Sequence, residues 1–323
     1  MDTNAVETGA QDIVEQIPNP PEWLTQALSV PREQGFVTVN GCRLRYYRWG
    51  DKSKPGVLMT HGFLAHSRCF AFIAPLLAND FHLVAFDMSG MGESDGHHEY
   101  PVETRVDELV GVAEQTGLFD NGAKPIIVAH SFGGMIATAT SFDHGDKFAG
   151  LVICDLMIIR PEILAKNKDR FGPPGSNRAD KPQKVYPDYE TAKQRFVLSP
   201  PQKVNEPALF DYMAYHSLKQ VEDGWSWKFD PSVFRRGPGM GRRWSEIGKY
   251  VAEAPIRKAI VYGRDSMLFP PDSVNYMNEL CDAVELPRIP MIGIPEARHH
   301  LMLDQPIAFA STIDSILKLW TSS

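Results

Sequence analysis

The sequence predicts an α/β fold: a mostly parallel central sheet with helices on both faces, interrupted by a largely helical insertion. Three observations carry this prediction. Short apolar runs rich in β-branched residues alternate with amphipathic stretches along most of the chain, which is typical of parallel strands joined by helices. One of these runs passes through a serine directly into a helical stretch. Between residues 156 and 243 the alternation stops.

Size and charge limit the kinds of protein that the chain can be. A chain of 323 residues can bury a large core and suits one α/β domain with an insertion. Its formal net charge of −7 does not suggest a nucleic-acid partner. No stretch approaches the roughly 20 apolar residues of a membrane span, and the first residues lack the basic and apolar leader of a secretory signal. We therefore expect no membrane span and a cytoplasmic location, and the oligomeric state stays open.

The cysteines do not indicate a metal site. They are widely scattered and show no metal-ligand spacing: Cys42, Cys69, Cys154 and Cys281. Cys154 lies in an apolar run, where a buried thiol is the expected state. The sequence therefore predicts no metal ion.

The chain begins with a polar arm over residues 1–34 that contains several prolines. A β-hairpin is expected next, because residues 36–39 and 43–47 are strand-like and flank Asn40 and Gly41. Asn-Gly between two such runs is the strongest short signal for a hairpin turn. We place the core domain at residues 35–155 and 244–323.

Further apolar runs predict buried strands of a parallel sheet. They cover residues 56–60, 82–87, 125–128, 149–155, 259–262 and 291–294. A helix is expected over residues 101–116, where apolar side chains recur on one face. A last helix near the C-terminus carries Phe309, Ile313 and Trp320 on one face.

We place a cap, or lid, insertion at residues 156–243. Prolines, glycines and charges are mixed there with a group of large apolar residues: Phe210, Tyr212, Met213, Tyr215, Trp225, Trp227 and Phe229. Most of these residues should simply form the core of the cap. A few should face the site and make it apolar.

The segment around Ser131 predicts a strained turn between a strand and a helix. Residues 125–128 read as a buried strand and residues 135–140 as a helix, with the serine between them. Such a turn lifts the hydroxyl above the sheet, and small residues such as Ala129 and Gly133 prevent clashes. The helix N-terminus behind the serine offers N–H groups to a developing negative charge. The alternative is an ordinary helix N-cap serine.

This segment resembles the G-x-S-x-G nucleophile elbow of the α/β-hydrolase family, with Ala129 in place of the first glycine. Two more passages resemble family motifs: the strand-end sequence His61-Gly62-Phe63, and the D-x-x-G-x-G-x-S loop that begins at Asp87. The resemblance covers about residues 35–320. It implies an oxyanion hole formed by the backbone N–H groups of Phe63 and Phe132. The loop that begins at Asp87 has a mainly architectural role in the family.

A fourth passage resembles a family motif and implies the catalytic base. His299, Asp304 and Pro306 match the family's H-x-x-x-x-[DE]-x-P signature before the last helix, although Arg298 stands where the family usually has glycine. The resemblance makes His299 the base that removes the proton of Ser131.

The carboxylate that orients His299 has two candidates. The family places this acid either after the last strand but one or, in some branches, after the strand that follows the elbow. In the first place the usual spacing from Gly263 falls on Ser266, and Asp265 is one residue short. In the second place Asp155 ends its strand. We favour Asp155, because spacing decides which side chain can point at the histidine, and keep Asp265 as the alternative.

These parts imply a serine hydrolase that cleaves a carboxylic ester or lactone of an apolar small molecule through an acyl-enzyme, without a metal or organic cofactor. A carbon–carbon bond hydrolase with the same triad is the alternative. A non-catalytic ligand receptor on the same fold is a third reading. Dehalogenase and epoxide hydrolase activities are disfavoured, because those relatives attack with an aspartate at the position of Ser131. Fold alone does not choose among these functions.

Overall fold

A computed structural model describes residues 7–10, 17–167, 179–235 and 245–322. Its main sheet has nine strands, and the predicted α/β fold is confirmed. Neighbouring strands pair antiparallel from β1 through β5 and parallel from β5 through β11. Across the sheet the order is β1 (Glu7–Ala10), β2 (Arg32–Val39), β3 (Cys42–Trp49), β5 (His82–Phe86), β4 (Gly56–Thr60), β6 (Ile126–His130), β7 (Gly150–Cys154), β10 (Lys258–Gly263) and β11 (Met291–Ile294).

The hairpin predicted at Asn40 and Gly41 is confirmed. Val39 of β2 faces Cys42 of β3, so the turn has two residues. Both turn residues have positive φ, 50° at Asn40 and 77° at Gly41, as a type I′ turn requires.

The described part of the N-terminal arm belongs to the core, which its polar, proline-containing sequence did not predict. β2 begins at Arg32 rather than after residue 34, and β1 extends the sheet beside it. Helix α1 (Glu22–Ser29) buries Leu24 and Leu28 against the body of the protein. The boundary at residue 34 therefore cuts through a strand.

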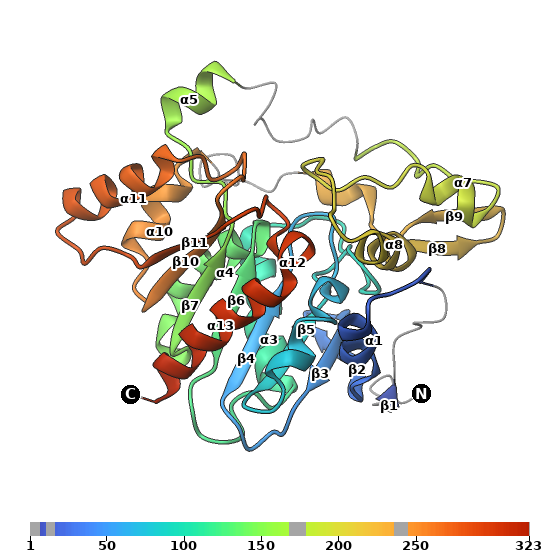
Figure 1. The fold of residues 1–323 in the computed structure, drawn as a ribbon, viewed down its shortest axis with the longest axis horizontal. Coiled ribbons are helices and arrows are strands. Elements are labelled where there is room, and N and C mark those ends of the chain that lie inside the picture. Colours follow the sequence, from blue (N-terminus) through green and yellow to red (C-terminus); the bar gives the residue numbers. More distant parts are fainter. Residues whose placement is uncertain (1–6, 11–16, 168–178, 236–244, 323) are drawn as a thin grey trace.

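Helices cover both faces of the sheet (Figure 1). The helices α1, α2 (Ala74–Leu77) and α13 (Pro306–Thr321) contribute to one apolar layer. The opposite layer contains α3 (Val102–Gln115), α4 (Phe132–His144), α10 (Ile247–Glu253) and α11 (Asp272–Ala283). Strands β4 to β7 are buried along their whole length, which explains their continuously apolar sequences.

The cap lies above one edge of the sheet (Figure 1) and contains a β-hairpin beside its helices, where a largely helical insertion was expected. It contains the helices α5 (Pro161–Lys166), α7 (Tyr189–Lys193) and α8 (Pro207–His216), the 3₁₀ turn η5 (Pro231–Phe234) and a hairpin of β8 (Leu218–Val221) and β9 (Gly224–Trp227). The hairpin turn is Glu222-Asp223, and Gly224, with a φ of 140°, is the first residue of β9.

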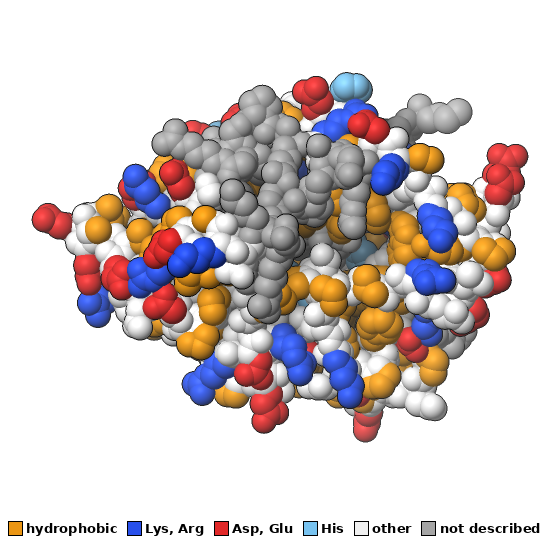
Figure 2. Space-filling model, turned by 90° about the horizontal axis from the view of Figure 1, so that it is seen from above, with side chains coloured by type: hydrophobic (Ala, Val, Ile, Leu, Met, Phe, Trp, Pro, Cys, Tyr) orange, Lys and Arg blue, Asp and Glu red, His pale blue; other side chains and the backbone are white. Residues whose placement is uncertain are grey.

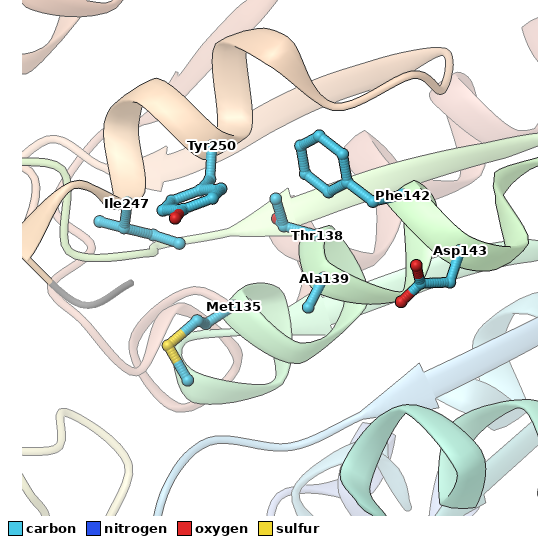
Figure 3. A pocket seen from close by; sticks show the side chains of 7 residues that line it. All are labelled: Met135, Thr138, Ala139, Phe142, Asp143, Ile247 and Tyr250. Atoms are coloured by element: carbon cyan, nitrogen blue, oxygen red, sulfur yellow. The ribbon is translucent and has the colours of Figure 1, made fainter. Parts of the chain in front are cut away.

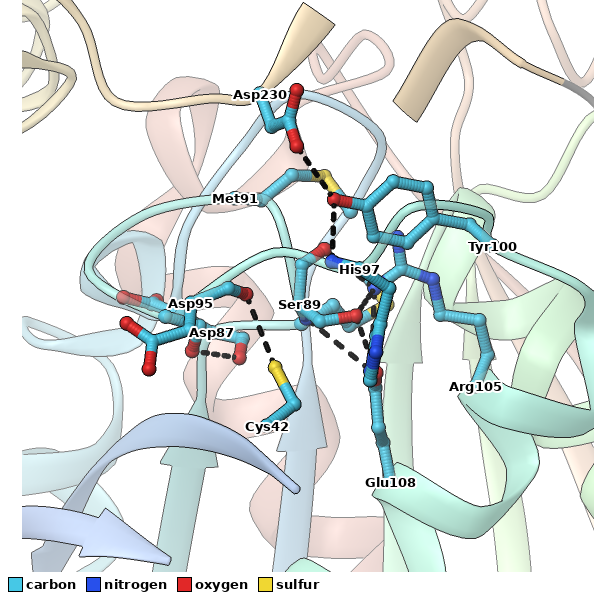
Figure 4. Close-up of polar contacts among 12 residues, drawn as sticks. Cys42, Asp87, Ser89, Met91, Asp95, His97, Tyr100, Arg105, Glu108 and Asp230 are labelled. Atoms are coloured by element: carbon cyan, nitrogen blue, oxygen red, sulfur yellow. Dashed lines mark hydrogen bonds and ion pairs between the residues drawn. The ribbon is translucent and has the colours of Figure 1, made fainter. Parts of the chain in front are cut away.

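The loop after β5 connects the cap to the core. The N–H of Asp230 in the cap donates to Gly90 O at 2.7 Å, and Met91 forms a β-bridge with Phe229. Tyr100 Oη donates to Asp230 Oδ2 at 3.0 Å (Figure 4). The glycine-rich loop is therefore architectural, as the resemblance implied.

Within the part of the chain that the structure describes, no helix is long and apolar enough to cross a bilayer. The four cysteines are buried and unpaired by disulfides. The described residues contain no group of three or more His, Cys, Asp or Glu side chains that could hold a metal ion.

Candidate active site

Ser131 occupies a strained turn between β6 and α4. Its φ is 53° and its ψ is −119°, a conformation that costs a non-glycine residue energy and persists only where the surroundings impose it. The Ser131 N–H donates to Cys154 O at 2.9 Å, which fixes the turn to the neighbouring strand β7. The side chain is half-buried. These features are those of a nucleophile elbow rather than of a simple helix N-cap.

The small residues around Ser131 are required by close backbone contacts. A Cβ on Gly133 would lie 2.7 Å from His61 O and 2.9 Å from Thr60 O, so no side chain fits there. Ala129 is fully buried in β6, and its methyl group is accommodated where the family usually has glycine.

The loop after β4 lies directly against this turn. A Cβ on Gly62 would be 3.2 Å from Ser131 Cβ. His61 fixes the loop, because its Nε2 accepts the Met88 N–H at 3.0 Å and its Nδ1 lies 2.7 Å from Gly62 O. The bond from Met88 requires an unprotonated Nε2, so Nδ1 carries the proton and donates to Gly62 O. Burial lowers the pKa of His61, which keeps this arrangement neutral.

Two backbone N–H groups near Ser131 are available to an anion. Phe63 follows the His61-Gly62 turn, and Phe132 is the first residue of α4. Within the described residues neither N–H donates to a protein acceptor. The two phenyl rings lie 5.5 Å apart between centroids, so the loop and the helix are packed together at this point. The positions fit the predicted oxyanion hole, whose function stays a prediction.

The structure brings Asp155, rather than Asp265, to His299. His299 Nδ1 lies 2.8 Å from Asp155 Oδ1, and the side chains are 3% and 0% exposed. Asp155 follows β7 with a φ of 47°. Asp265 is exposed, and its N–H donates to Ala297 O.

Two further hydrogen bonds hold the Asp155 carboxylate. The Gly263 N–H donates to Oδ2 at 2.8 Å, and Ser266 Oγ donates to Oδ1 at 2.6 Å. Ser266 is the residue on which the usual spacing of the family's acid falls. The two family positions for the acid therefore meet here, with the carboxylate on one and a hydroxyl donor on the other.

His130 contacts both the backbone and the ring of His299. Sequence reasoning missed this role. His130 Nε2 donates to His299 O at 2.8 Å, and the two rings lie 4.7 Å apart. Burial, and then the proximity of His299, lower the pKa of His130 to about 3. The ring is therefore neutral at physiological pH. Its position directly before Ser131 was the signal that could have been read.

Asp304 shapes the loop that carries His299. Its Oδ2 accepts the Arg298 N–H at 2.7 Å, at the end of the short helix α12 (Leu301–Asp304). Arg298 donates through Nη1 to Lys203 O at 3.2 Å. The arginine in place of the usual glycine thus adds a contact to the segment that follows α7.

A cavity of about 380 Å³ lies between the core and the cap, and its lining includes His130 and His300, the sequence neighbours of Ser131 and His299. From the core, Phe63, His130 and His300 line it. Its apolar wall from the cap includes Tyr186, Phe196, Val197, Met213, Trp227 and Phe229. Figure 2 shows hydrophobic side chains gathered on this face beside the residues drawn in grey.

Three of the large apolar residues expected in the cap, Met213, Trp227 and Phe229, line the cavity. The other four do not, and Tyr212 is fully buried in the core cluster. A smaller pocket of about 120 Å³ lies between α4 and α10, bordered by Met135, Phe142 and Tyr250 (Figure 3). None of the predicted site residues borders it, so we do not assign the chemistry there.

The chain belongs to the α/β-hydrolase family, whose sequence pattern matches residues 57–312. A serine hydrolase-like protein of Danio rerio is 23% identical over 290 residues, which cover 85% of each protein. Epoxide hydrolase 3 of Xenopus tropicalis is 25% identical over 126 residues, which cover 38% of this chain and 33% of that protein. The chain spans less than half the length of the first curated relatives that it matches.

The fold is shared with solved hydrolase structures. E-2-(acetamidomethylene)succinate hydrolase superimposes with a TM-score of 0.71 and 17% sequence identity, over 89% of this chain and 99% of that one. At this identity the likeness concerns the fold alone, so the reaction has to be argued from the site.

Proposed function

We propose that the protein is a serine hydrolase that cleaves a carboxylic ester or lactone of an apolar small molecule through an acyl-enzyme. The observation that carries the proposal is the combination of the strained Ser131 turn with the buried His299–Asp155 pair. The His299 ring lies 4.7 Å from the ring of His130, the residue directly before Ser131. Ser131 follows β6, Asp155 follows the adjacent strand β7, and His299 follows β11, so all three lie at the carboxyl ends of strands of the same sheet.

The chemistry follows from these positions. Ser131 Oγ attacks the carbonyl carbon while His299 Nε2 takes its proton, and Asp155 accepts a hydrogen bond from Nδ1–H and stabilises the imidazolium. The N–H groups of Phe63 and Phe132 stabilise the oxyanion. Collapse breaks the carbon–oxygen bond, and His299 returns the proton to the leaving alcohol. Water, deprotonated by His299, then attacks the acyl-enzyme and releases the acid and Ser131.

The apolar cavity supports a substrate with a hydrocarbon part. Its lining is mostly aromatic and aliphatic, with a smaller set of polar side chains that includes Arg195, Lys228 and three histidines. The same triad and cavity would also serve a carbon–carbon bond hydrolase, which is the second candidate. Epoxide opening is not proposed, because the nucleophile position holds Ser131 and not an aspartate.

Labelling with a fluorophosphonate tests the proposal. We expect stoichiometric modification of the wild type at Ser131 and none of Ser131→Ala, because only an activated serine reacts with this reagent. A panel of esters, lactones and vinylogous diketones then separates the two candidate reactions. A folded wild-type protein that is not labelled, or that hydrolyses no member of the panel, would contradict the proposed function.

A further inference from the structure

His66 is a buried imidazole that the proposed mechanism does not use. It lies three residues after Phe63, directly before the 3₁₀ turn η2 (Ser67–Phe70), and lines the cavity between core and cap. The residue is 2% exposed. Its Nδ1 is buried and has no hydrogen-bond partner among the described residues. A buried polar atom without a partner costs free energy, so its retention calls for an explanation.

Ser217, at the end of α8, fixes which nitrogen of His66 carries the proton. Ser217 Oγ lies 2.7 Å from Met213 O and 3.0 Å from His66 Nε2. Two oxygens at 2.7 Å need a proton between them, and the single hydroxyl proton of Ser217 must therefore point at Met213 O. The hydroxyl can then only accept from His66, so Nε2 carries the proton and Nδ1 is a bare acceptor.

The surroundings keep this imidazole neutral and supply it no donor. Burial lowers the pKa of His66 to about 4, so the ring is uncharged at physiological pH. Lys228 also lines the cavity, but its ammonium group donates to Glu93 Oε1 at 3.0 Å. Arg195, Ser199 and His300 also line the cavity, and the His216 ring lies 6.5 Å from the His66 ring between centroids, but no described group donates to His66 Nδ1. The donor that His66 lacks must come from whatever fills the cavity.

We propose that His66 Nδ1 accepts a hydrogen bond from a hydroxyl or N–H group of the substrate. The substrate is then an ester or lactone whose apolar body carries one hydrogen-bond donor inside the cavity. This inference rests on the proposed function and deepens it. His66 is the specificity-determining residue, and Ser217 is a positioning residue that acts through the imidazole tautomer.

The proposal predicts how the enzyme ranks matched substrates. The test uses aryl and alkyl esters in sets of three. The three members of a set differ at one carbon of the acyl or alcohol chain, which carries a hydroxyl, a keto oxygen or only hydrogens. Successive sets place this carbon at different positions along the chain. At the matching position we expect kcat/KM of the hydroxyl ester to exceed that of both others by about tenfold to a hundredfold, as for one buried hydrogen bond. The keto ester is rejected because it faces Nδ1 with an acceptor.

Two variants and a control separate this role from a structural one. His66→Leu removes the acceptor and should abolish the preference for the hydroxyl ester. Ser217→Ala releases the tautomer, so the ring can present an N–H instead, and the keto ester should gain relative to the hydrogen-only ester. His82→Leu removes another buried imidazole, at the start of β5 and outside the cavity lining, and should leave all three ratios as in the wild type.

Fluorophosphonate titration of Ser131 normalises every sample to its content of competent sites, and loss of labelling in the wild type would contradict the proposed function itself. If labelling is intact, equal kcat/KM for the three esters at every position in both series would overturn the assignment of His66. The same preference in wild type and His66→Leu would overturn it too. Unchanged rejection of the keto ester by Ser217→Ala would contradict the tautomer argument on which the assignment depends.

Discussion

Asp155 illustrates how much at the residue scale depends on one hydrogen bond. Its carboxylate is fully buried and is held by Gly263 and Ser266 while it faces His299 Nδ1 at 2.8 Å. An amide at this position would offer the imidazole the wrong hydrogen-bonding partner and favour the wrong tautomer. We therefore expect Asp155→Asn to lower kcat for an ester by about 10⁴ without unfolding the protein.

Asp265→Asn is the matched control, because Asp265 lies on the same loop as Ser266 but is exposed. Its kcat should stay close to that of the wild type when both variants are assayed with the same ester. A crippled Asp265→Asn beside a nearly normal Asp155→Asn would show that the later loop provides the acid after all.

Because Asp155 and Ser266 are in contact, we predict that the carboxylate that orients His299 can be transferred from position 155 to position 266. Ser266 Oγ lies 2.6 Å from the same carboxylate oxygen that faces His299, so an aspartate at 266 should reach the imidazole. We expect the double variant Asp155→Asn, Ser266→Asp to be about tenfold to a hundredfold more active than Asp155→Asn alone. Steady-state kinetics checks this, with Asp155→Asn, Ser266→Ala as the control that should gain nothing. A double variant as slow as Asp155→Asn would refute the relocation.

The sequence predicted Ser131, His299 and Asp155 as a set, and the structure places the last two in contact. The sequence alone could not choose firmly between Asp155 and Asp265. Backbone torsions in a loop can absorb a one-residue offset, and no local sequence pattern encodes those torsions. His66 and His130 escaped prediction for a different reason. A lone histidine has no periodic signature, and its neighbours here come from segments far along the chain, such as Ser217.

At the scale of elements, the contact between α4 and the loop after β4 decides the geometry of the elbow. A Cβ on Gly133 would meet the backbone oxygen His61 O at 2.7 Å, whereas a Cβ on Gly134 would first meet a side-chain methyl, Ile153 Cγ2, at 3.3 Å. Gly133→Ala should therefore lower the free energy of unfolding by about 1–3 kcal/mol. It should also slow ester hydrolysis, because the loop that carries Phe63 must move.

Gly134→Ala provides the comparison. The alanine gains roughly 0.5–1 kcal/mol of helix stability, which offsets a small shift of Ile153, so activity and denaturant midpoint should stay near the wild-type values. Equal behaviour of the two variants would contradict the view that backbone contact with His61 restricts position 133.

The elements that the sequence predicted are those with strong local signals. The parallel strands are continuous apolar runs, and Asn40-Gly41 marks the β2–β3 hairpin. The cap hairpin was missed although Asp223-Gly224 is a dipeptide typical of hairpin turns, because its two strands are only four residues long. Its strands are held by non-local aromatic packing, such as Tyr186 against Trp227 with ring centroids 5.8 Å apart.

At the scale of the whole molecule, a buried polar cluster beside the cap connection predicts a pH dependence of stability (Figure 4). Glu108 is fully buried and accepts from Ser89 N at 3.2 Å and from Arg105 Nη1 at 3.2 Å. Burial alone would raise its pKa, but Arg105 and the hydrogen bonds from His97 and Ser89 lower it below the ordinary value. A carboxylate with a lowered folded-state pKa stabilises the fold above its unfolded pKa, and this contribution is lost as the pH falls through the folded value.

Comparison of the wild type with Glu108→Gln isolates this contribution. We expect the variant to be less stable by about 1–3 kcal/mol at pH 7, and the difference to be constant down to about pH 5 and to shrink below about pH 4.3, the ordinary glutamate pKa. Urea unfolding across this pH range measures it. A difference that stays constant to pH 3, or grows there, would show that Glu108 is not held as a stabilised carboxylate.

The most direct test of the central claim is to observe the covalent intermediate on Ser131. The wild type is mixed with an excess of a hexanoate ester, quenched with acid during turnover and examined by intact mass and peptide mapping. We predict a mass increase of one hexanoyl group on the peptide that contains Ser131, and its absence from Ser131→Ala, which should also be inactive but folded. Turnover that persists in Ser131→Ala, or an acyl group on a different residue of the wild type, would contradict this claim.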